Sequence, residues 1–127
     1  ADNRQYRHML NDPEITSRFR VIAFDMPWHG KSYPPEGYQD QEYKLSTALY
    51  VETITAFCRA LELDKPVVIG CSIGGRIVLQ LAHLHSDKFR ALIGVEAADH
   101  HPAPALPVAR NELSLGAAGG PVAAMVA

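Results

Sequence analysis

Two kinds of hydrophobic pattern alternate along the first hundred residues of the chain. Short continuous apolar runs suit strands that are buried on both faces, and apolar residues that recur every three or four positions suit helices with one buried face. The continuous runs predict strands at residues 20–25, from 67 onward, and at 89–95. The periodic segments predict helices at residues 2–11, 45–61 and 74–85.

The two longer periodic segments also predict which side chains are buried. In residues 45–61 the expected buried stripe is Leu45, Leu49, Ile54, Phe57 and Leu61. In residues 74–85 it is Ile77, Val78, Leu81 and Leu84. Helices that alternate with buried strands indicate an α/β fold, in which a parallel sheet is flanked by helices on both faces as a three-layer sandwich.

The composition changes after about residue 100. Of the 27 residues from 101 to 127, 15 are alanine, proline or glycine, and aromatic residues are absent. We therefore assign residues 1–100 to the core of one domain and interpret residues 101–127 as a tail, a linker or a lid fragment.

Composition and charge exclude several classes of function. The net charge is −2, and the chain has no lysine or arginine cluster, so neither a nucleic acid nor a membrane is an expected partner. Two cysteines make no disulfide framework, and a reducing cytoplasm is the expected compartment. No ligand-spaced cluster of Cys, His and acidic residues is present, so we expect no metal and no other cofactor.

The clearest chemical signal lies where the second strand meets the third helix. Residues 67–75 read Val-Val-Ile-Gly-Cys-Ser-Ile-Gly-Gly, in which Gly70, Ser72 and Gly74 fit the spacing G-x-S-x-G. Such a turn holds the serine in a sparsely populated backbone region, at a cost of roughly 1–3 kcal/mol. The turn needs neighbours without side chains, because a Cβ two positions before or after the serine would collide with the opposite arm.

With this context the chain resembles part of an α/β-hydrolase, and residues 70–75 are similar to the nucleophile elbow of that family. Residues 20–32, Arg-Val-Ile-Ala-Phe-Asp-Met-Pro-Trp-His-Gly-Lys-Ser, are similar to the preceding strand and its Asp-x-x-Gly-His-Gly-x-Ser turn, with Trp28 where the pattern usually has glycine. The resemblance covers residues 1–99 and implies a partial, incomplete α/β-hydrolase fold. It also implies a serine hydrolase that cleaves a small acyl compound such as an ester, a lactone or a thioester.

The resemblance assigns roles to particular residues. Ser72 is the expected nucleophile, and the backbone N–H of Ile73 is the expected oxyanion donor. Glu96 directly follows the strand at 89–95 and is the first candidate for the acid, with Asp99 as the alternate. A serine also needs a histidine as its base.

In the family this histidine follows the last strand. His83 and His85 belong to the third helix, on its expected exposed side, and His100 and His101 follow Glu96 too closely in sequence. We therefore expect the histidine to lie outside this sequence, and the chain to be an internal portion of a longer hydrolase.

Three further residues near these motifs have structural interpretations. We expect the Asp25 side chain to bind N–H groups of its own turn, and His29 to shape that loop and border the pocket. Cys71 is expected to be a buried, inert thiol. In the family another strand lies between the strands of Val21 and Val67, so we expect a further segment or another chain to complete the sheet.

Two other functions remain open. A non-catalytic α/β module that binds a ligand or a partner, or an inactive truncated fragment, would retain the turn around Ser72 without using its hydroxyl. A phosphate-binding turn at residues 70–75 is the third alternative, although the G-x-G-x-x-G spacing and the Walker lysine are both absent.

Overall fold

The computed structural model describes residues 2–34, 36–40, 42, 46–97 and 122–126 of the chain. Its strands are β1 (Phe19–Ala23), β2 (Val67–Cys71), β3 (Ala91–Val95) and β4 (Val122–Val126). Its α-helices are α1 (Arg7–Asn11), α2 (Pro13–Thr16), α3 (Thr47–Ala60) and α4 (Ile73–His85). Short 3-10 helices are η1 (Asn3–Tyr6), η2 (Tyr38–Asp40) and η3 (Ser86–Lys88).

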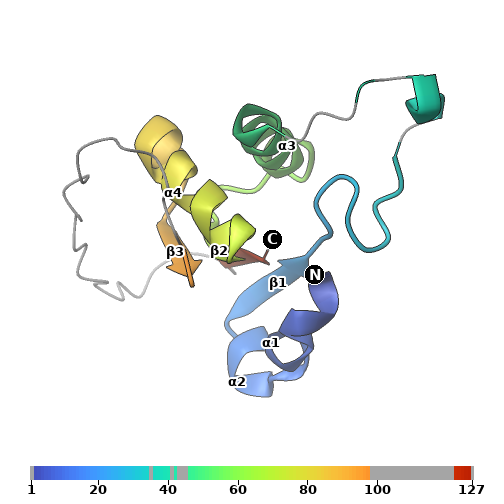
Figure 1. The fold of residues 1–127 in the computed structure, drawn as a ribbon. Helices are drawn as coiled ribbons and strands as arrows, with labels where there is room; N and C mark the ends of the chain where they lie inside the picture. Colours follow the sequence, from blue (N-terminus) through green and yellow to red (C-terminus); the bar gives the residue numbers. More distant parts are fainter. Residues whose placement is uncertain (1, 35, 41, 43–45, 98–121, 127) are drawn as a thin grey trace.

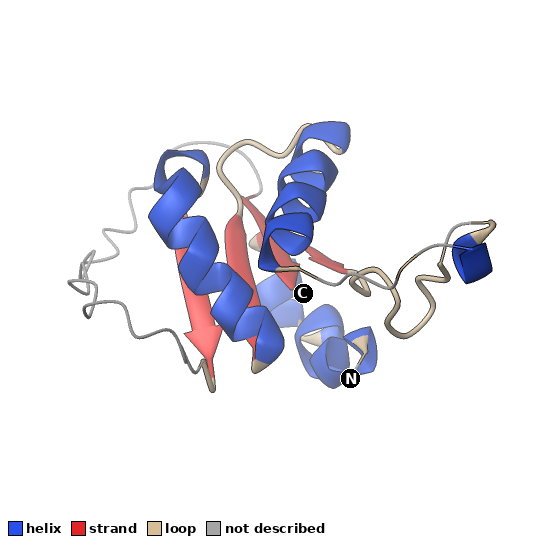
Figure 2. Ribbon diagram, turned by 45° about the horizontal axis from the view of Figure 1, so that its top comes forward, coloured by secondary structure: helices blue, strands red, loops and turns tan. Residues whose placement is uncertain are grey.

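The strands form one parallel sheet in the order β1-β4-β2-β3, as the alternation of elements predicted. Figure 1 shows α3 and α4 on one side of this sheet and the α1–α2 segment beside β1 on the other. In Figure 2 the long axes of α3 and α4 run roughly along the strands that they cover. The predicted α/β architecture with helices on both faces is therefore confirmed.

The N-terminal helical segment is divided where its sequence contains stop and start signals. The predicted helix at 2–11 is η1 followed by α1, and it ends before Asp12. The Asp12 side chain then accepts a hydrogen bond from the Glu14 backbone N–H, and Pro13 opens α2. An acidic N-cap followed by proline at the first helical position is a favourable helix start.

The strands of Val21 and Val67 are not neighbours, as expected, and β4 lies between them. β1 pairs with β4 from Phe19↔Val122 to Ala23↔Val126, and β2 pairs with β4 from Val67↔Ala124 to Ile69↔Val126. Residues 122–126, which belong to the expected tail, form this strand, and their backbone groups pair with the strands on both sides. The rest of the expected tail, residues 101–121 and 127, lies outside the described residues.

The core is built where α3 and α4 pack on the sheet. Its buried members include Met26, Tyr50, Val51, Ile54, Val68, Ile77, Val78, Leu81 and Phe89. On α4 the predicted stripe is confirmed for Ile77, Val78 and Leu81 but is wrong for Leu84, which is 55% exposed. Thirteen helical residues span about 20 Å and five strand residues about 17 Å, so roughly the last two residues of α4, Leu84 and His85, extend past the sheet.

On α3 the buried face is wider than the predicted stripe. Ile54 is buried as predicted, whereas Leu61 is exposed because it follows the helix as its C-cap. Tyr50 and Val51, which the stripe omitted, are buried because α3 packs against α4 and also against the residues that follow β1. Leu45 lies outside the described residues.

Candidate active site

Ser72 stands at a sharp turn between β2 and α4. Its φ is 56° and its ψ is −111°, a backbone region that L-residues rarely adopt, and the next residue begins the helix. The Ser72 backbone N–H donates a hydrogen bond of 2.9 Å to the Val95 carbonyl at the end of β3. The residue is exposed, so its hydroxyl is accessible at the carboxyl edge of the sheet.

Two glycines allow this turn to form. A Cβ added to Gly70 would overlap the backbone carbonyl of Gly74, which is the opposite arm of the turn. A Cβ added to Gly75 would lie 2.9 Å from the Val95 carbonyl oxygen and 3.0 Å from the Ala97 Cβ. The collision predicted for the residue two positions before the serine is therefore present in the structure, and Gly75 lets α4 approach the end of β3.

The first turn of α4 directly follows Ser72. Ile73 is the first residue of α4, and its side chain is 61% exposed. The N–H groups in the first turn of an α-helix lack intrahelical acceptors, and the positive end of the helix dipole lies there. These features would stabilise an anion beside Ser72, as the predicted oxyanion role of the Ile73 N–H requires. That role stays a prediction.

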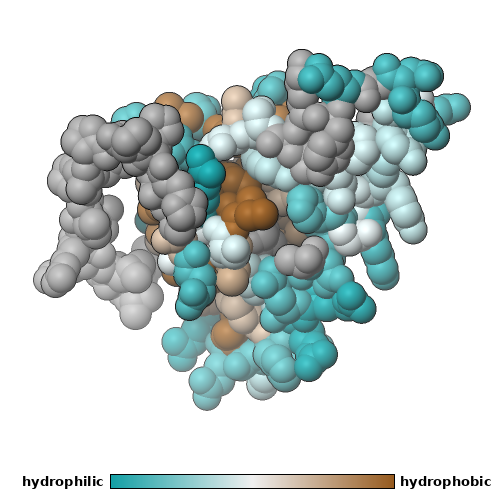
Figure 3. Space-filling model, in the orientation of Figure 1, coloured by the Kyte–Doolittle hydropathy of each residue, from teal (hydrophilic) through white to brown (hydrophobic). Residues whose placement is uncertain are grey.

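A cavity of about 110 Å³ opens in front of Ser72. Its walls come from four parts of the chain, namely the N-terminal turn (residues 2–6), the residues that follow β1, α3, and the residues from the end of β2 into α4. They are Asp2, Gln5, Phe24, Asp25, Met26, His29, Tyr50, Cys71, Ser72, Ile73, Gly74 and Ile77. Figure 3 shows an apolar area over the start of α4 that is bordered by hydrophilic side chains.

A buried carboxylate organises the wall that follows β1. We call residues 24–32 the Asp25 loop. The Asp25 side chain accepts hydrogen bonds from the backbone N–H of Lys31 at 2.9 Å and of Asn3 at 2.6 Å, and the Ser32 hydroxyl donates to the Asp25 carbonyl. The turn-stabilising role predicted for Asp25 is confirmed, and the bond to Asn3 also ties the loop to the N-terminal turn.

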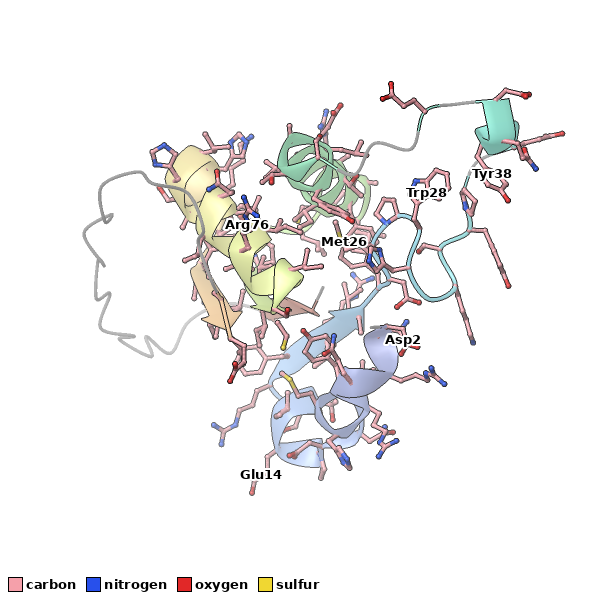
Figure 4. All side chains as sticks on the ribbon, in the orientation of Figure 1. Asp2, Glu14, Met26, Trp28, Tyr38 and Arg76 are labelled. Atoms are coloured by element: carbon pink, nitrogen blue, oxygen red, sulfur yellow. The ribbon has the colours of Figure 1, made fainter. Side chains whose placement is uncertain are left out.

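His29 and Trp28 occupy the middle of the Asp25 loop. His29 lines the cavity, as predicted, and its Nδ1 lies 2.9 Å from the Pro27 carbonyl oxygen. Trp28 has a φ of 70°, so it occupies the left-handed region at the position where the family pattern usually has glycine. Its ring meets that of Tyr38 edge to face, with centroids 5.3 Å apart (Figure 4). The loop thus adopts the turn that glycine would favour and holds the indole outside the cavity.

The sequence did not identify the N-terminal turn as part of the site. Asp2 and Gln5 both line the cavity, although the 3.6-residue pattern indicated only an amphipathic surface helix. A hydrogen bond from the Arg4 side chain holds the pKa of the Asp2 carboxyl at about 2. No local signal could have revealed these positions, since they depend on how η1 docks on the Asp25 loop.

Tyr6 connects the same turn to the elbow, residues 70–75. Its side chain is 9% exposed, and burial raises the pKa of its hydroxyl, while a hydrogen bond with the Cys71 backbone opposes that shift. Cys71 itself is half-buried and lines the cavity. The expectation that this thiol is buried was therefore wrong, because Cys71, at the carboxyl end of β2, lines the cavity.

Glu96 lies beside the elbow but not in the cavity. Cys71 and Val95 are register partners at the ends of β2 and β3. Ser72 and Glu96 therefore directly follow two neighbouring strands. The Glu96 side chain is exposed, and its φ is 52°. Its role as an acid stays a prediction, and the alternate Asp99, like His100 and His101, lies outside the described residues. His83 is exposed on α4 as expected, and His85 is half-buried.

The described residues contain no group of three or more His, Cys, Asp or Glu side chains that could hold a metal ion. In the same part of the chain, no helix has the length and apolar character needed to cross a membrane.

Comparison with known proteins identifies related chains. A family model described as the alpha/beta hydrolase fold matches residues 3–120. The chain is 33% identical over 101 residues to the magnesium-chelatase 30 kDa subunit of Rhodobacter capsulatus, which covers 80% of this chain and 32% of the relative. It is 33% identical over 89 residues to a pimeloyl-[acyl-carrier protein] methyl ester esterase of Neisseria meningitidis, covering 68% and 30%.

A third relative is the 2-hydroxymuconate semialdehyde hydrolase of Pseudomonas sp. strain CF600, which is 35% identical over 81 residues, or 64% of this chain and 27% of the relative. The chain thus spans about a third of the length of the curated relatives that it matches. No solved structure matches it.

Proposed function

The chain belongs to the alpha/beta hydrolase fold family, and from that premise we propose that it carries the nucleophile of a serine hydrolase that acts on an acyl compound. The observation that carries the proposal is the strained, exposed Ser72 between β2 and α4. Backbone strain of this kind persists where the surrounding structure imposes it, and it concentrates at functional sites.

In the proposed reaction the Ser72 hydroxyl attacks the carbonyl carbon of the substrate. The negative charge then develops on the carbonyl oxygen, and the Ile73 N–H at the start of α4 would donate a hydrogen bond to it. Removal of one such donor typically costs about 3 kcal/mol of transition-state stabilisation. Glu96, which follows the neighbouring strand, would orient the histidine that takes the serine proton.

The proposed substrate class is a small carboxylic ester, a lactone or a thioester. Two observations support an acyl substrate of limited size. The cavity in front of Ser72 has a volume of about 110 Å³ and several apolar lining residues, including Phe24, Met26 and Ile77. Two relatives carry the names of an ester esterase and of a semialdehyde hydrolase. The two free cysteines favour a reducing compartment for this reaction.

Covalent labelling of the serine tests the proposal most directly. A fluorophosphonate probe should label the intact protein at Ser72, because the probe reacts with activated serines, and peptide mass spectrometry would locate the adduct. Ser72→Ala should remove the label and lower turnover of short p-nitrophenyl esters by at least 10³-fold. Ser86→Ala, which changes an exposed serine beyond the far end of α4, is the matched control and should leave both readings unchanged.

The same experiment separates the two main alternatives. Absence of label at Ser72 in a sample whose circular dichroism shows folded α/β structure would support the non-catalytic binding module. Undiminished ester turnover in the Ser72→Ala protein would exclude Ser72 as the nucleophile.

A further inference from the structure

The imidazole ring of His29 has one nitrogen bonded to its own loop. The side chain is half-buried and lines the cavity together with Ser72. Its Nδ1 lies 2.9 Å from the Pro27 carbonyl oxygen, and a carbonyl oxygen can only accept, so Nδ1 carries the proton of this bond. In a neutral imidazole one nitrogen donates and the other accepts. The Pro27 carbonyl therefore sets the tautomer in which Nε2 is a hydrogen-bond acceptor.

The other ring nitrogen, Nε2, is open to a ligand. Within the part of the chain that the structure describes, no group makes a hydrogen bond to Nε2, and this atom is not one of the buried side-chain atoms that lack a partner. A ring nitrogen that is neither bonded nor buried is accessible from outside the protein. Because His29 lines the cavity, a ligand bound there is placed to donate a hydrogen bond to Nε2.

The backbone on both sides of His29 is also held in place. The His29 N–H donates to the Met26 carbonyl at 2.9 Å, and the His29 carbonyl accepts from the Ser32 N–H at 2.9 Å. The next residue, Gly30, has a φ of 51° and passes so close to the Asp25 carboxylate that an added Cβ would overlap it. A side chain that is already fixed loses little further freedom when a ligand binds, so Nε2 is a preorganised acceptor.

The two carboxylates that line the cavity differ from His29, because the chain itself already bonds them. Both oxygens of Asp25 accept backbone N–H groups. The Asp2 carboxylate accepts hydrogen bonds from the backbone and the side chain of Arg4. A ligand would have to compete with these donors for either carboxylate, whereas the described residues supply no donor to His29 Nε2.

We propose that His29 selects acyl substrates that carry a hydroxyl group on the acyl chain, with the hydroxyl donating a hydrogen bond to Nε2 while the acyl carbonyl lies beside Ser72. This inference rests on the proposed function and adds a substrate class to it. Both residues line one cavity of about 110 Å³, so a short acyl chain can reach them together. A site that bonds a substrate hydroxyl discriminates against the analogue without it, because the acceptor then loses its partner.

Two matched esters measure this selection in the intact protein. The kcat/KM for p-nitrophenyl β-hydroxybutyrate should be roughly tenfold higher than that for p-nitrophenyl butyrate, which lacks only the hydroxyl. Turnover of both esters with equal kcat/KM, or with a preference for the butyrate, would overturn the selection and leave the proposed function standing. Turnover of neither ester, together with no fluorophosphonate label at Ser72, would overturn the proposed function and this inference with it.

Two substitutions of His29 separate the ligand acceptor from the bond to the loop. His29→Asn offers an amide N–H near the position of Nδ1 and can keep the bond to Pro27, but it has no atom at the position of Nε2. His29→Gln reaches that position with an acceptor oxygen. The ratio of the two kcat/KM values should fall to about one in H29N and recover in part in H29Q. His83→Asn, at an exposed histidine of α4, is the matched control and should keep the wild-type ratio. A wild-type ratio in H29N would overturn the role of His29.

Nitrogen NMR of the imidazole rings tests the acceptor without any turnover. At about pH 8.5, where an ordinary imidazole is neutral, His29 should show a protonated Nδ1 and an unprotonated Nε2. In the Ser72→Ala protein, ethyl β-hydroxybutyrate should shift the Nε2 resonance of His29, and ethyl butyrate at the same concentration should shift it much less. The opposite tautomer, or equal shifts with the two esters, would overturn the proposal whether or not Ser72 is a nucleophile.

Discussion

The two main walls of the cavity are held in place by different forces. Around Ser72 the elbow is positioned by steric contact, since Gly70 and Gly75 admit backbone at distances that no Cβ permits. Around Asp25 the loop is positioned by hydrogen bonds, because one buried carboxylate accepts backbone N–H groups from Lys31 and Asn3. The first wall depends on the absence of side chains, and the second depends on the presence of one.

This difference predicts how each wall fails. Steric exclusion of backbone from backbone has no way to relax, so a single added methyl group should disrupt the elbow. A hydrogen-bonded loop can exchange its lost partners for water, so removal of the carboxylate should loosen the loop without unfolding the sheet.

The largest effect is expected from Gly70→Ala. The added Cβ would overlap the Gly74 carbonyl group, so we expect the free energy of unfolding to fall by about 3 kcal/mol and fluorophosphonate labelling of Ser72 to be lost. Urea unfolding and labelling measure the two effects. Gly37→Ala is the matched control, since its φ is 77° but no atom lies within 4 Å of the added Cβ, and backbone strain alone should cost roughly 1 kcal/mol.

A smaller effect is expected from Asp25→Ala, which leaves the N–H groups of Asn3 and Lys31 without their acceptor. We expect the free energy of unfolding to fall by about 2 kcal/mol and the Lys31 amide to exchange faster, whereas the Ser72 amide, bonded to Val95, keeps its protection. Asp12→Ala removes a half-buried helix N-cap away from the cavity and should cost about 1 kcal/mol. Equal loss of protection at Lys31 and Ser72 would show that the walls are not independent.

The smallest effect is expected from Tyr6→Phe, which touches both walls because η1 carries Tyr6 to the Cys71 backbone. Loss of this hydrogen bond should cost about 1 kcal/mol at neutral pH. Burial raises the pKa of the Tyr6 hydroxyl above its ordinary value of 10.0, so the folded state keeps the proton at pH values where the unfolded state has lost it.

The stability that comes from this raised pKa is complete below about pH 10 and is lost as the pH rises through the folded-state pKa. Tyr6→Phe should therefore flatten the decline of stability between pH 9 and 11, as measured by urea unfolding. Burial likewise raises the pKa of the Cys58 thiol, but this group is present in both proteins and cancels in the comparison. Tyr33→Phe, at a side chain that is 87% exposed, should leave the profile unchanged.

The sequence predictions succeeded where a feature depends on residues close together in sequence, and they failed where it depends on distant ones. The turn at Ser72 was predictable because its strain and its steric requirement arise within residues 70–75. The turn at Asp25 was predictable for the same reason, since its carboxylate bonds Lys31 six residues away. The half-buried Cys71 and the cavity positions of Asp2 and Gln5 were not, because they depend on elements that are distant in sequence.

Hydrophobic periodicity had a similar limit. It located α4 and three of its four expected buried residues, but Leu84 is exposed because the sheet ends before the helix does. The length of a helix is encoded locally, whereas the length of the surface beneath it depends on other strands.

By itself, the sequence determined the alternation of helices and strands, the parallel sheet and the strained serine, because each follows from side-chain period or from contacts within one turn. Only the tertiary structure decided that residues 122–126 separate β1 from β2 and that the N-terminal turn borders the cavity. Those features arise from pairing between segments about a hundred residues apart, or from docking of one element on another, and no local pattern of residues encodes them.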